Sequence, residues 1–211
     1  IVSIIIYNKK LADKNLFYLV SGMVLIFVTI AIPVQLNGNW VTILWAGQAA
    51  LLFWIGRTKK ASFYERLSYI VMFIAFFSLL EDWAVGYNQY YADDPESRIT
   101  PLLNLNFLTS ILFIAAFGFI NYLNGQNKYP SRLENSKGIL KIVGFLIPAI
   151  FVFSIYYAFR IEIMNYFDQL YVDSSIQIDS EDQGYSNYFQ NYDLRNFKTV
   201  WVINYSLLFV S

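Results

Sequence analysis

Four charged residues are the candidates for chemistry in this chain. Glu81 and Asp82 are adjacent in the stretch FFSLLEDWAVGY, and Arg160 and Glu162 follow another long apolar run. In such a setting a carboxylate can act as a general base or metal ligand, and an arginine can hold an anionic phosphate. If the first stretch crosses a membrane, its carboxylates cost about 2.5–3.5 kcal/mol each, and such residues usually mark a site. The alternative is a pair at the headgroup boundary with Trp83 as an interfacial anchor.

Arg160 and Glu162 allow two interpretations. They can pair with Glu81 or Asp82 and form one charged cluster at the outer face of a membrane. Alternatively, they are a local i, i+2 pair whose side chains point in different directions and extend toward the headgroups.

A second set of candidates is polar but uncharged. Gln48 lies in the middle of an apolar run, and Asn106, Thr109 and Ser110 share one helical face at spacings of three and four residues. Lipid offers such groups no partner, so hydrogen bonds between helices are expected. The lining of a transport path is the alternative.

Other chemistries are excluded or disfavoured. The chain has no His and no Cys, which removes the usual zinc sites and the Cys–His and Ser–His–Asp nucleophiles. The net charge of zero argues against a generally basic nucleic-acid binder. Residues 179–184 partly resemble the opening of a calcium loop, but the twelfth position is Gln190 rather than Glu. We therefore predict no metal and no cofactor.

The elements that position these residues follow from composition. The chain is 57% hydrophobic and 14% charged, with a mean hydropathy of +0.43, whereas soluble domains carry about 25% charged residues. We predict an all-α, polytopic transmembrane bundle of six to seven spans, 1–211 being one region of a larger chain. The spans are expected at 1–7, 16–36, 40–56, 67–85, 102–123, 139–159 and 199–211, the first and last being partial.

The connections between these spans alternate in charge. Residues 8–15, 57–66 and 124–141 contain eleven of the fifteen Lys and Arg residues but three of the fifteen Asp and Glu residues. The segments 37–39, 86–101 and 160–198 are uncharged or acidic. Because short Lys/Arg-rich loops stay in the cytoplasm, the first three segments are predicted to be cytoplasmic and the others extracytoplasmic. Segment 160–198 is expected to continue the sixth helix along the membrane surface and then to be irregular.

The stretch LNGNWVTILWAGQAALLFWIG resembles a repeated element of a bacterial family of multi-pass membrane proteins, domain of unknown function 2339 (DUF2339). The matching residues are Trp40, Trp45, Leu52, Trp54 and Gly56. Gln48 departs from the pattern, since the family often has an acidic residue at that position. Residues 197–210 match the same pattern more weakly. The resemblance implies a protein of the bacterial cytoplasmic (inner) membrane. It implies no established activity and no catalytic residues.

Two classes of function are open. The first is a non-enzymatic envelope, scaffold or transport-related component, whose partners are the lipid bilayer and other proteins or copies in the membrane. The second is a membrane enzyme acting on a lipid-linked glycan or other envelope precursor at the outer leaflet. If the protein is an enzyme, we expect a groove beside Glu81 and Asp82. If it is a transporter, we expect a polar path from Gln48 to Asn106. A scaffold predicts neither feature.

Overall fold

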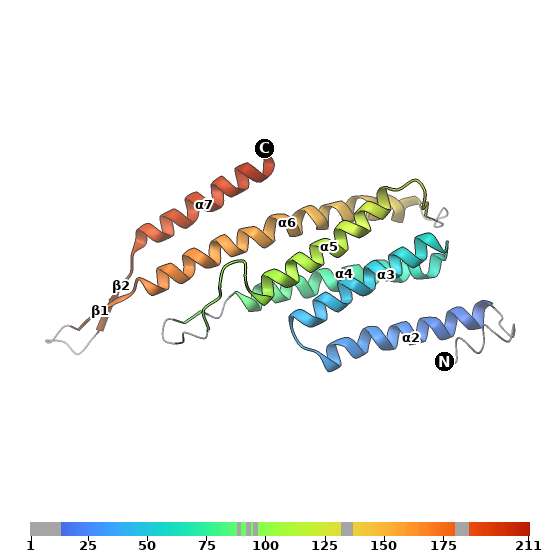
Figure 1. Cartoon of the computed structure of the whole chain (residues 1–211), viewed down its shortest axis with the longest axis horizontal. Helices are drawn as coiled ribbons and strands as arrows, with labels where there is room; N and C mark the ends of the chain where they lie inside the picture. Colours follow the sequence, from blue (N-terminus) through green and yellow to red (C-terminus); the bar gives the residue numbers. More distant parts are fainter. Residues whose placement is uncertain (1–13, 88–89, 92–93, 95–96, 132–136, 180–185) are drawn as a thin grey trace.

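The computed structural model describes residues 14–87, 90–91, 94, 97–131, 137–179 and 186–211. Within these ranges the chain forms six helices and one short hairpin (Figure 1). The helices are α2 (Lys14–Gln35), α3 (Asn39–Thr58), α4 (Ser62–Gly86), α5 (Leu105–Gly125), α6 (Lys137–Asp173) and α7 (Tyr192–Val210). The strands are β1 (Ile176–Asp179) and β2 (Ser186–Phe189).

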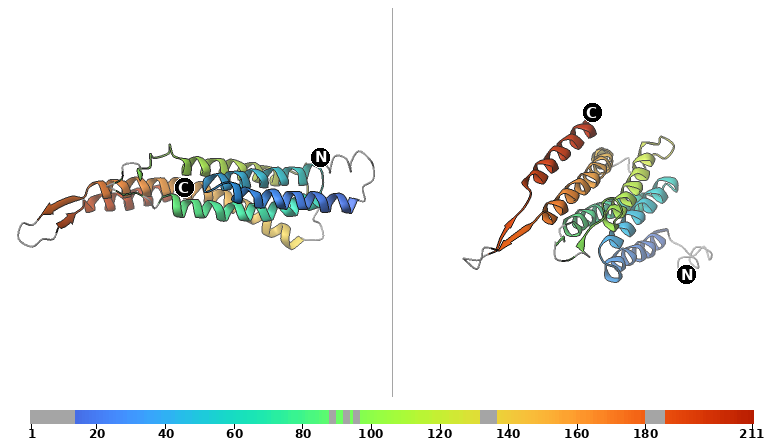
Figure 2. Two further views of the ribbon diagram at one scale, coloured as in Figure 1. Left: turned by 90° about the horizontal axis from the view of Figure 1, so that it is seen from below. Right: turned by 60° about the vertical axis from the view of Figure 1, so that its left-hand side comes forward.

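The helices run side by side in alternating directions (Figures 1 and 2). The core lies between α3, α4 and α5, with α6 packed against α5 and α4. It is built from small residues that let backbones approach and from aromatic rings that fill the remaining space. Its fully buried members include Ala49, Phe53, Ala75, Leu79, Phe113 and Phe117. The outer faces carry large exposed apolar side chains, including Val34, Phe145 and Leu208. Four helices, namely α3, α4, α5 and residues Leu140–Asp173 of α6, are long and apolar enough to cross a membrane.

This architecture fits an integral membrane protein. It confirms that the chain is a bundle of long apolar helices, as the predicted all-α class requires. The predicted number of spans is not reached among the described residues. The apolar part of α2, Val20–Gln35, is shorter than a full span, and α7 starts at Tyr192 with charged residues in its first two turns. The expected partial span at 1–7 lies outside the described residues.

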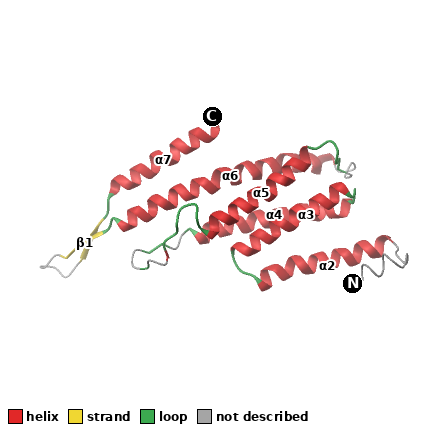
Figure 3. Cartoon of the chain, viewed as in Figure 1, coloured by secondary structure: helices red, strands yellow, loops and turns green. Residues whose placement is uncertain are grey.

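The sixth helix continues beyond residue 159, as expected, but the rest of the interpretation of residues 160–198 needs correction. The helix continues without interruption to Asp173, so α6 has 37 residues, about 55 Å at 1.5 Å per residue. It keeps its direction along the bundle instead of turning onto a membrane surface (Figure 1). Beyond it the chain is not wholly irregular, because β1 and β2 pair in antiparallel register from Ile176↔Phe189 to Asp179↔Ser186 (Figure 3).

The connections collect at two ends of the bundle. The α3–α4 turn and the α5–α6 connection lie at one end, and the α2–α3 turn, the α4–α5 loop and the hairpin lie at the other (Figure 1). The α3–α4 turn is tight, since a Cβ placed on Gly56 would lie 2.7 Å from the Glu65 backbone nitrogen. At the opposite end α5 is capped by Asn104, whose side chain accepts a hydrogen bond from Phe107 N at 2.7 Å.

Candidate functional site

Asp82 ties α4 to α3. Its side chain is 8% exposed, and its Oδ2 accepts a hydrogen bond from Thr42 Oγ1 at 2.5 Å. Thr42 Oγ1 also lies 2.6 Å from Ser78 Oγ, one helical turn earlier on α4. Glu81, the neighbouring residue, is exposed, because successive residues of a helix point about 100° apart. The two carboxylates predicted as a pair therefore occupy different environments.

Glu81 and Asp82 both line a cavity of about 610 Å³, here called the acidic groove. It lies where the end of α2, the start of α3, the end of α4 and the start of α5 meet. Its uncharged polar side chains include Asn37, Asn39, Ser78 and Asn106. Its described lining contains no Lys or Arg, so the charge of the acidic groove suits a neutral or cationic molecule better than an anion.

The expected hydrogen bonds between helices are present around this groove. Asn39 Nδ2 donates to Asn106 Oδ1 at 2.9 Å and to Thr109 Oγ1 at 3.0 Å, which joins α3 to α5. Ser110 Oγ accepts from Trp83 Nε1 at 2.8 Å, which joins α5 to α4. These polar residues act as interhelical ties, as their positions in apolar helices predict.

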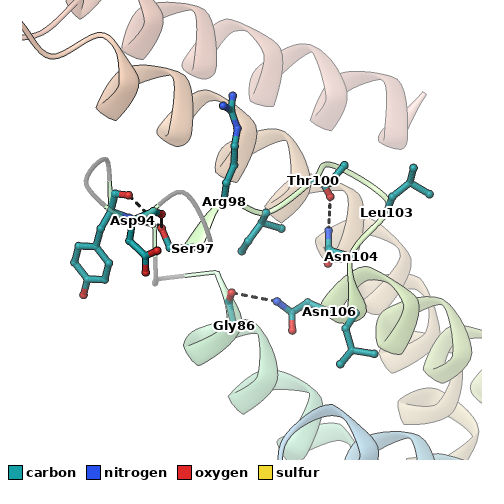
Figure 4. Close-up of a pocket in the computed structure, with 11 residues that line it drawn as sticks. Gly86, Asp94, Ser97, Arg98, Thr100, Leu103, Asn104 and Asn106 are labelled. Carbon is teal, nitrogen blue, oxygen red and sulfur yellow. Dashed lines mark hydrogen bonds between the residues drawn. The ribbon is translucent and has the colours of Figure 1, made fainter.

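A second polar cavity lies beside the acidic groove (Figure 4). This loop cavity has a volume of about 730 Å³ and shares Gly86 and Asn106 with the groove. Figure 4 shows the Asn106 side chain reaching Gly86, where its Nδ2 donates to the carbonyl oxygen at 3.1 Å. Arg98 lines the loop cavity and pairs with Asp173 of α6 at 3.4 Å. The polar end of the bundle thus has two adjoining hollows, separated by the Asn106 side chain.

Among the four charged candidates, Glu162 has the carboxylate that accepts the most hydrogen bonds. Its side chain is 3% exposed. Oε1 accepts from Tyr87 Oη at 2.6 Å and from Asn104 Nδ2 at 2.7 Å, and Oε2 accepts from Leu102 N at 2.8 Å. One carboxylate of α6 therefore holds the residue after α4, the α4–α5 loop and the cap of α5. It also supports a loop that turns through the left-handed region at Leu102, where φ is 61°.

Two further contacts fasten the same loop to α6. Gln169 accepts from Ile99 N at 3.2 Å and donates to Ile99 O at 3.0 Å. Tyr90 donates to Asp173 near the end of the helix. Burial and the hydrogen bond to Glu162 raise the pKa of Tyr87 above its ordinary value. The α4–α5 loop is therefore held at several points along the last three turns of α6.

The single charged cluster considered from the sequence does not form. Arg160 lies with its guanidinium carbon 5.7 Å from the ring centroid of Tyr157, and none of the ion pairs of the described residues joins it to Glu81 or Asp82. Asp82 faces α3, whereas Glu162 faces the α4–α5 loop. Arg160 and Glu162 point to different surroundings, as the alternative predicts, but the Glu162 carboxylate is buried among protein donors and does not extend outward.

Gln48 belongs to a different contact, between α3 and α2. Its Nε2 donates to Thr29 Oγ1 at 2.7 Å, and Trp45, one turn earlier, donates from Nε1 to Thr29 O at 3.1 Å. Trp45 lines the acidic groove, but Gln48 does not. Gln48 and Asn106 therefore do not line the same cavity.

The sequence interpretation missed a buried ion pair at the opposite end of the bundle. Arg57 and Glu65 were counted among the charges of the loop 57–66, but they are 6% and 1% exposed, with Nε and Oε1 2.9 Å apart. Arg57 also donates to Asn124 Oδ1 at 2.7 Å and to Tyr129 O at 2.9 Å. Tyr69 donates to Glu65 Oε1 at 2.8 Å. Opposite charges on either side of the short α3–α4 turn were the signal available in the sequence.

In the described part of the chain, no group of three or more Asp or Glu residues is placed to hold a metal ion. Most of the segment that resembles a calcium loop lies outside the described residues. No family model, no curated protein and no solved structure matches the chain. The resemblance to domain of unknown function 2339 therefore stays a prediction.

Proposed function

We propose that this chain is part of a non-enzymatic component of the bacterial cytoplasmic membrane, with its basic connections in the cytoplasm and the acidic groove outside. The observation that carries the proposal is the environment of Glu162. Three donors from three consecutive segments satisfy its carboxylate. A carboxylate used in this way stabilises an arrangement of helices and leaves few lone pairs for a reacting group.

The other buried charged groups support the same interpretation. Asp82 accepts from the neighbouring helix α3, and Arg57 pairs with Glu65 across the α3–α4 turn. Exposed apolar side chains on α2 and α7 supply a surface for lipid or for further helices. A rigid membrane scaffold accounts for these features together. Membership of the domain of unknown function 2339 family, based on the Trp40–Gly56 stretch, is part of this proposal.

Orientation can be tested with single cysteines, because the chain has none of its own. Thr100→Cys and Lys59→Cys place a thiol on an exposed residue at each end of the bundle. We expect a membrane-impermeant maleimide to label Thr100→Cys in intact spheroplasts and Lys59→Cys after lysis alone. Labelling of Lys59→Cys in intact spheroplasts, with Thr100→Cys protected until lysis, would reverse the proposed topology.

The non-enzymatic role can be tested by complementation of a strain that lacks the gene. Glu81→Gln removes the exposed carboxylate of the acidic groove, and we expect it to restore growth and envelope integrity as fully as the wild-type chain. Loss of complementation at an unchanged level in the membrane contradicts the proposal. The matched control is Asp94→Asn, which removes an exposed carboxylate from the neighbouring loop cavity.

The second candidate is a membrane enzyme acting on a lipid-linked glycan or envelope precursor. A groove of about 610 Å³ beside Glu81 and Asp82 favours it, since this is the cavity such an enzyme predicts. The charge of the lining does not favour a phosphate-linked substrate, and Arg160, the residue expected to hold the phosphate, does not line the groove. The Glu81→Gln experiment separates the two candidates, because an enzyme that uses this carboxylate would lose activity.

A further inference from the structure

A separate pocket lies between α4 and α6, on the side of α4 away from the acidic groove. Trp83 and Tyr87 line it from α4 and the residue that follows, and Tyr157 and Asn165 line it from α6. The groove uses Ser78 and Asp82 instead. Residues 80, 83 and 87 are offset by about half a turn from residues 78, 82 and 85, so the two sets lie on opposite faces of the helix. The volume of this α4–α6 pocket is about 370 Å³, within the range of about 300–1,000 Å³ for small-molecule sites.

Asn165 is the unexplained polar group of this pocket. Its side chain is 5% exposed, and its Nδ2 has no hydrogen-bond partner among the described residues. Two other donors in the lining are engaged, since Trp83 donates to Ser110 and Tyr87 donates to Glu162. A buried amide without a partner costs about 1–3 kcal/mol. A ligand that supplies hydrogen-bonding groups removes this penalty.

The charge of the pocket indicates a neutral ligand. Asp168 is the one charged residue in its described lining, and Lys198 of α7 neutralises it, with Nζ 2.5 Å from Oδ1. The remaining carboxylate oxygen can accept a hydrogen bond from a hydroxyl. An amide and a carboxylate together therefore match neighbouring hydroxyl groups, each of which both donates and accepts.

The rest of the lining is aromatic and apolar. Phe153 and Tyr157 are stacked, with ring centroids 5.6 Å apart, and Tyr157 lies 4.8 Å from Trp83. The negative faces of aromatic rings attract C–H groups, and one face of a sugar ring is made of C–H groups with hydroxyls at its rim. We propose that the α4–α6 pocket binds a neutral sugar ring, with Asn165 and Asp168 contacting its hydroxyls and the Trp83 and Tyr157 rings contacting its C–H face.

The position of the pocket allows two sources for such a ring. Glu162 and Gln169 contact the α4–α5 loop, so Asn165, which lies between them in the sequence, is at the level of the loop. Phe153 lies about 18 Å further down the helix, in an apolar stretch suited to acyl chains, and is 41% exposed. A glycolipid headgroup fits this arrangement, and a free sugar presents the same hydroxyl chemistry.

The test uses the whole chain in phosphatidylcholine nanodiscs. Native mass spectrometry measures the retention of monoglucosyl diacylglycerol, with diacylglycerol and phosphatidylglycerol as comparison lipids. Calorimetry with methyl β-D-glucopyranoside tests the free sugar. We expect binding of at least one glucose-bearing probe, with about tenfold weaker affinity in Asn165→Ala, the loss of about one hydrogen bond. The matched control Asn204→Ala, an exposed amide on α7, should bind as the wild type does.

Two additional measurements separate binding from folding. Asn165→Ala should melt at or above the wild-type temperature, because it removes an amide that lacks a partner. Ala84→Leu fills the pocket and leaves Asn165 in place, so it should also weaken binding. The proposal is wrong if neither glucose probe binds, if Asn165→Ala and Ala84→Leu both bind as the wild type does, or if the comparison lipids are retained equally. Binding of the lipid probe alone identifies a membrane source, and binding of methyl glucoside alone identifies a soluble one.

Discussion

Replacement of Glu162 by alanine should destabilise the fold more than a typical substitution. The change removes the acceptor of three hydrogen bonds, from Tyr87, Asn104 and Leu102. A hydrogen bond to a charged group contributes about 1.5–3 kcal/mol. The three contributions do not add fully, because water can reach the exposed Leu102 segment once the carboxylate is gone. We therefore expect a loss of about 3–4 kcal/mol in the free energy of unfolding.

Glu162→Gln is the informative partner of this variant. It keeps the shape of the side chain and one acceptor oxygen but places an NH₂ group against at least one donor. We expect it to lose about 1–2 kcal/mol. Unfolding by sodium dodecyl sulfate in mixed micelles, followed by tryptophan fluorescence, measures both losses. Glu81→Gln is the control and should change stability by less than about 0.5 kcal/mol, because that side chain is exposed.

The result that refutes this reasoning is an alanine variant within about 0.5 kcal/mol of the wild type. Hydrogen exchange adds a local measurement. The Leu102 amide should exchange faster in Glu162→Ala than in Glu81→Gln, since its acceptor has been removed. Unchanged protection at Leu102 would show that the loop does not depend on the carboxylate.

Three other predictions follow from the structure. Burial and the hydrogen bond to Glu162 raise the pKa of Tyr87 above its ordinary value of 10.0. Above pH 10 the unfolded chain therefore releases a proton that the folded chain retains, so the free energy of unfolding should fall as pH rises. Alkaline unfolding curves should show a less steep fall in Tyr87→Phe. Arg57→Met should lower the free energy of unfolding by about 3–5 kcal/mol in the same detergent titration, because it leaves Glu65 buried without its partner. The double variant Arg57→Met, Glu65→Leu should lose less. An equal or greater loss in the double variant would contradict the ion-pair argument. Gly56→Ala should lose about 1–3 kcal/mol, because its Cβ would lie 2.7 Å from the Glu65 backbone, while Gly47→Ala, with nothing within 4 Å of its Cβ, should be neutral or stabilising in thermal melts.

Local properties of the sequence were sufficient for the helices of the bundle. The lengths and hydropathies of residues 40–56, 67–85 and 102–123 predicted the positions of α3, α4 and α5, because a membrane-spanning helix satisfies its backbone within its own segment. The alternation of basic and acidic connections predicted that they would lie at opposite ends. The continuation of the sixth helix beyond Phe159 was predicted, but its residues were attributed to a membrane surface. In the structure, several of these residues contact the α4–α5 loop.

Only the tertiary structure decided which polar groups meet. In the sequence Glu162 is an isolated acid near an arginine, and nothing local links it to Tyr87, 75 residues away. Arg57 and Glu65 resembled ordinary loop charges until helix packing buried both. Apolar patterning identifies the residues that avoid water, since that property belongs to each segment alone. Hydrogen-bond partners depend on the rotation and depth of neighbouring helices, which only the packing of the whole bundle determines.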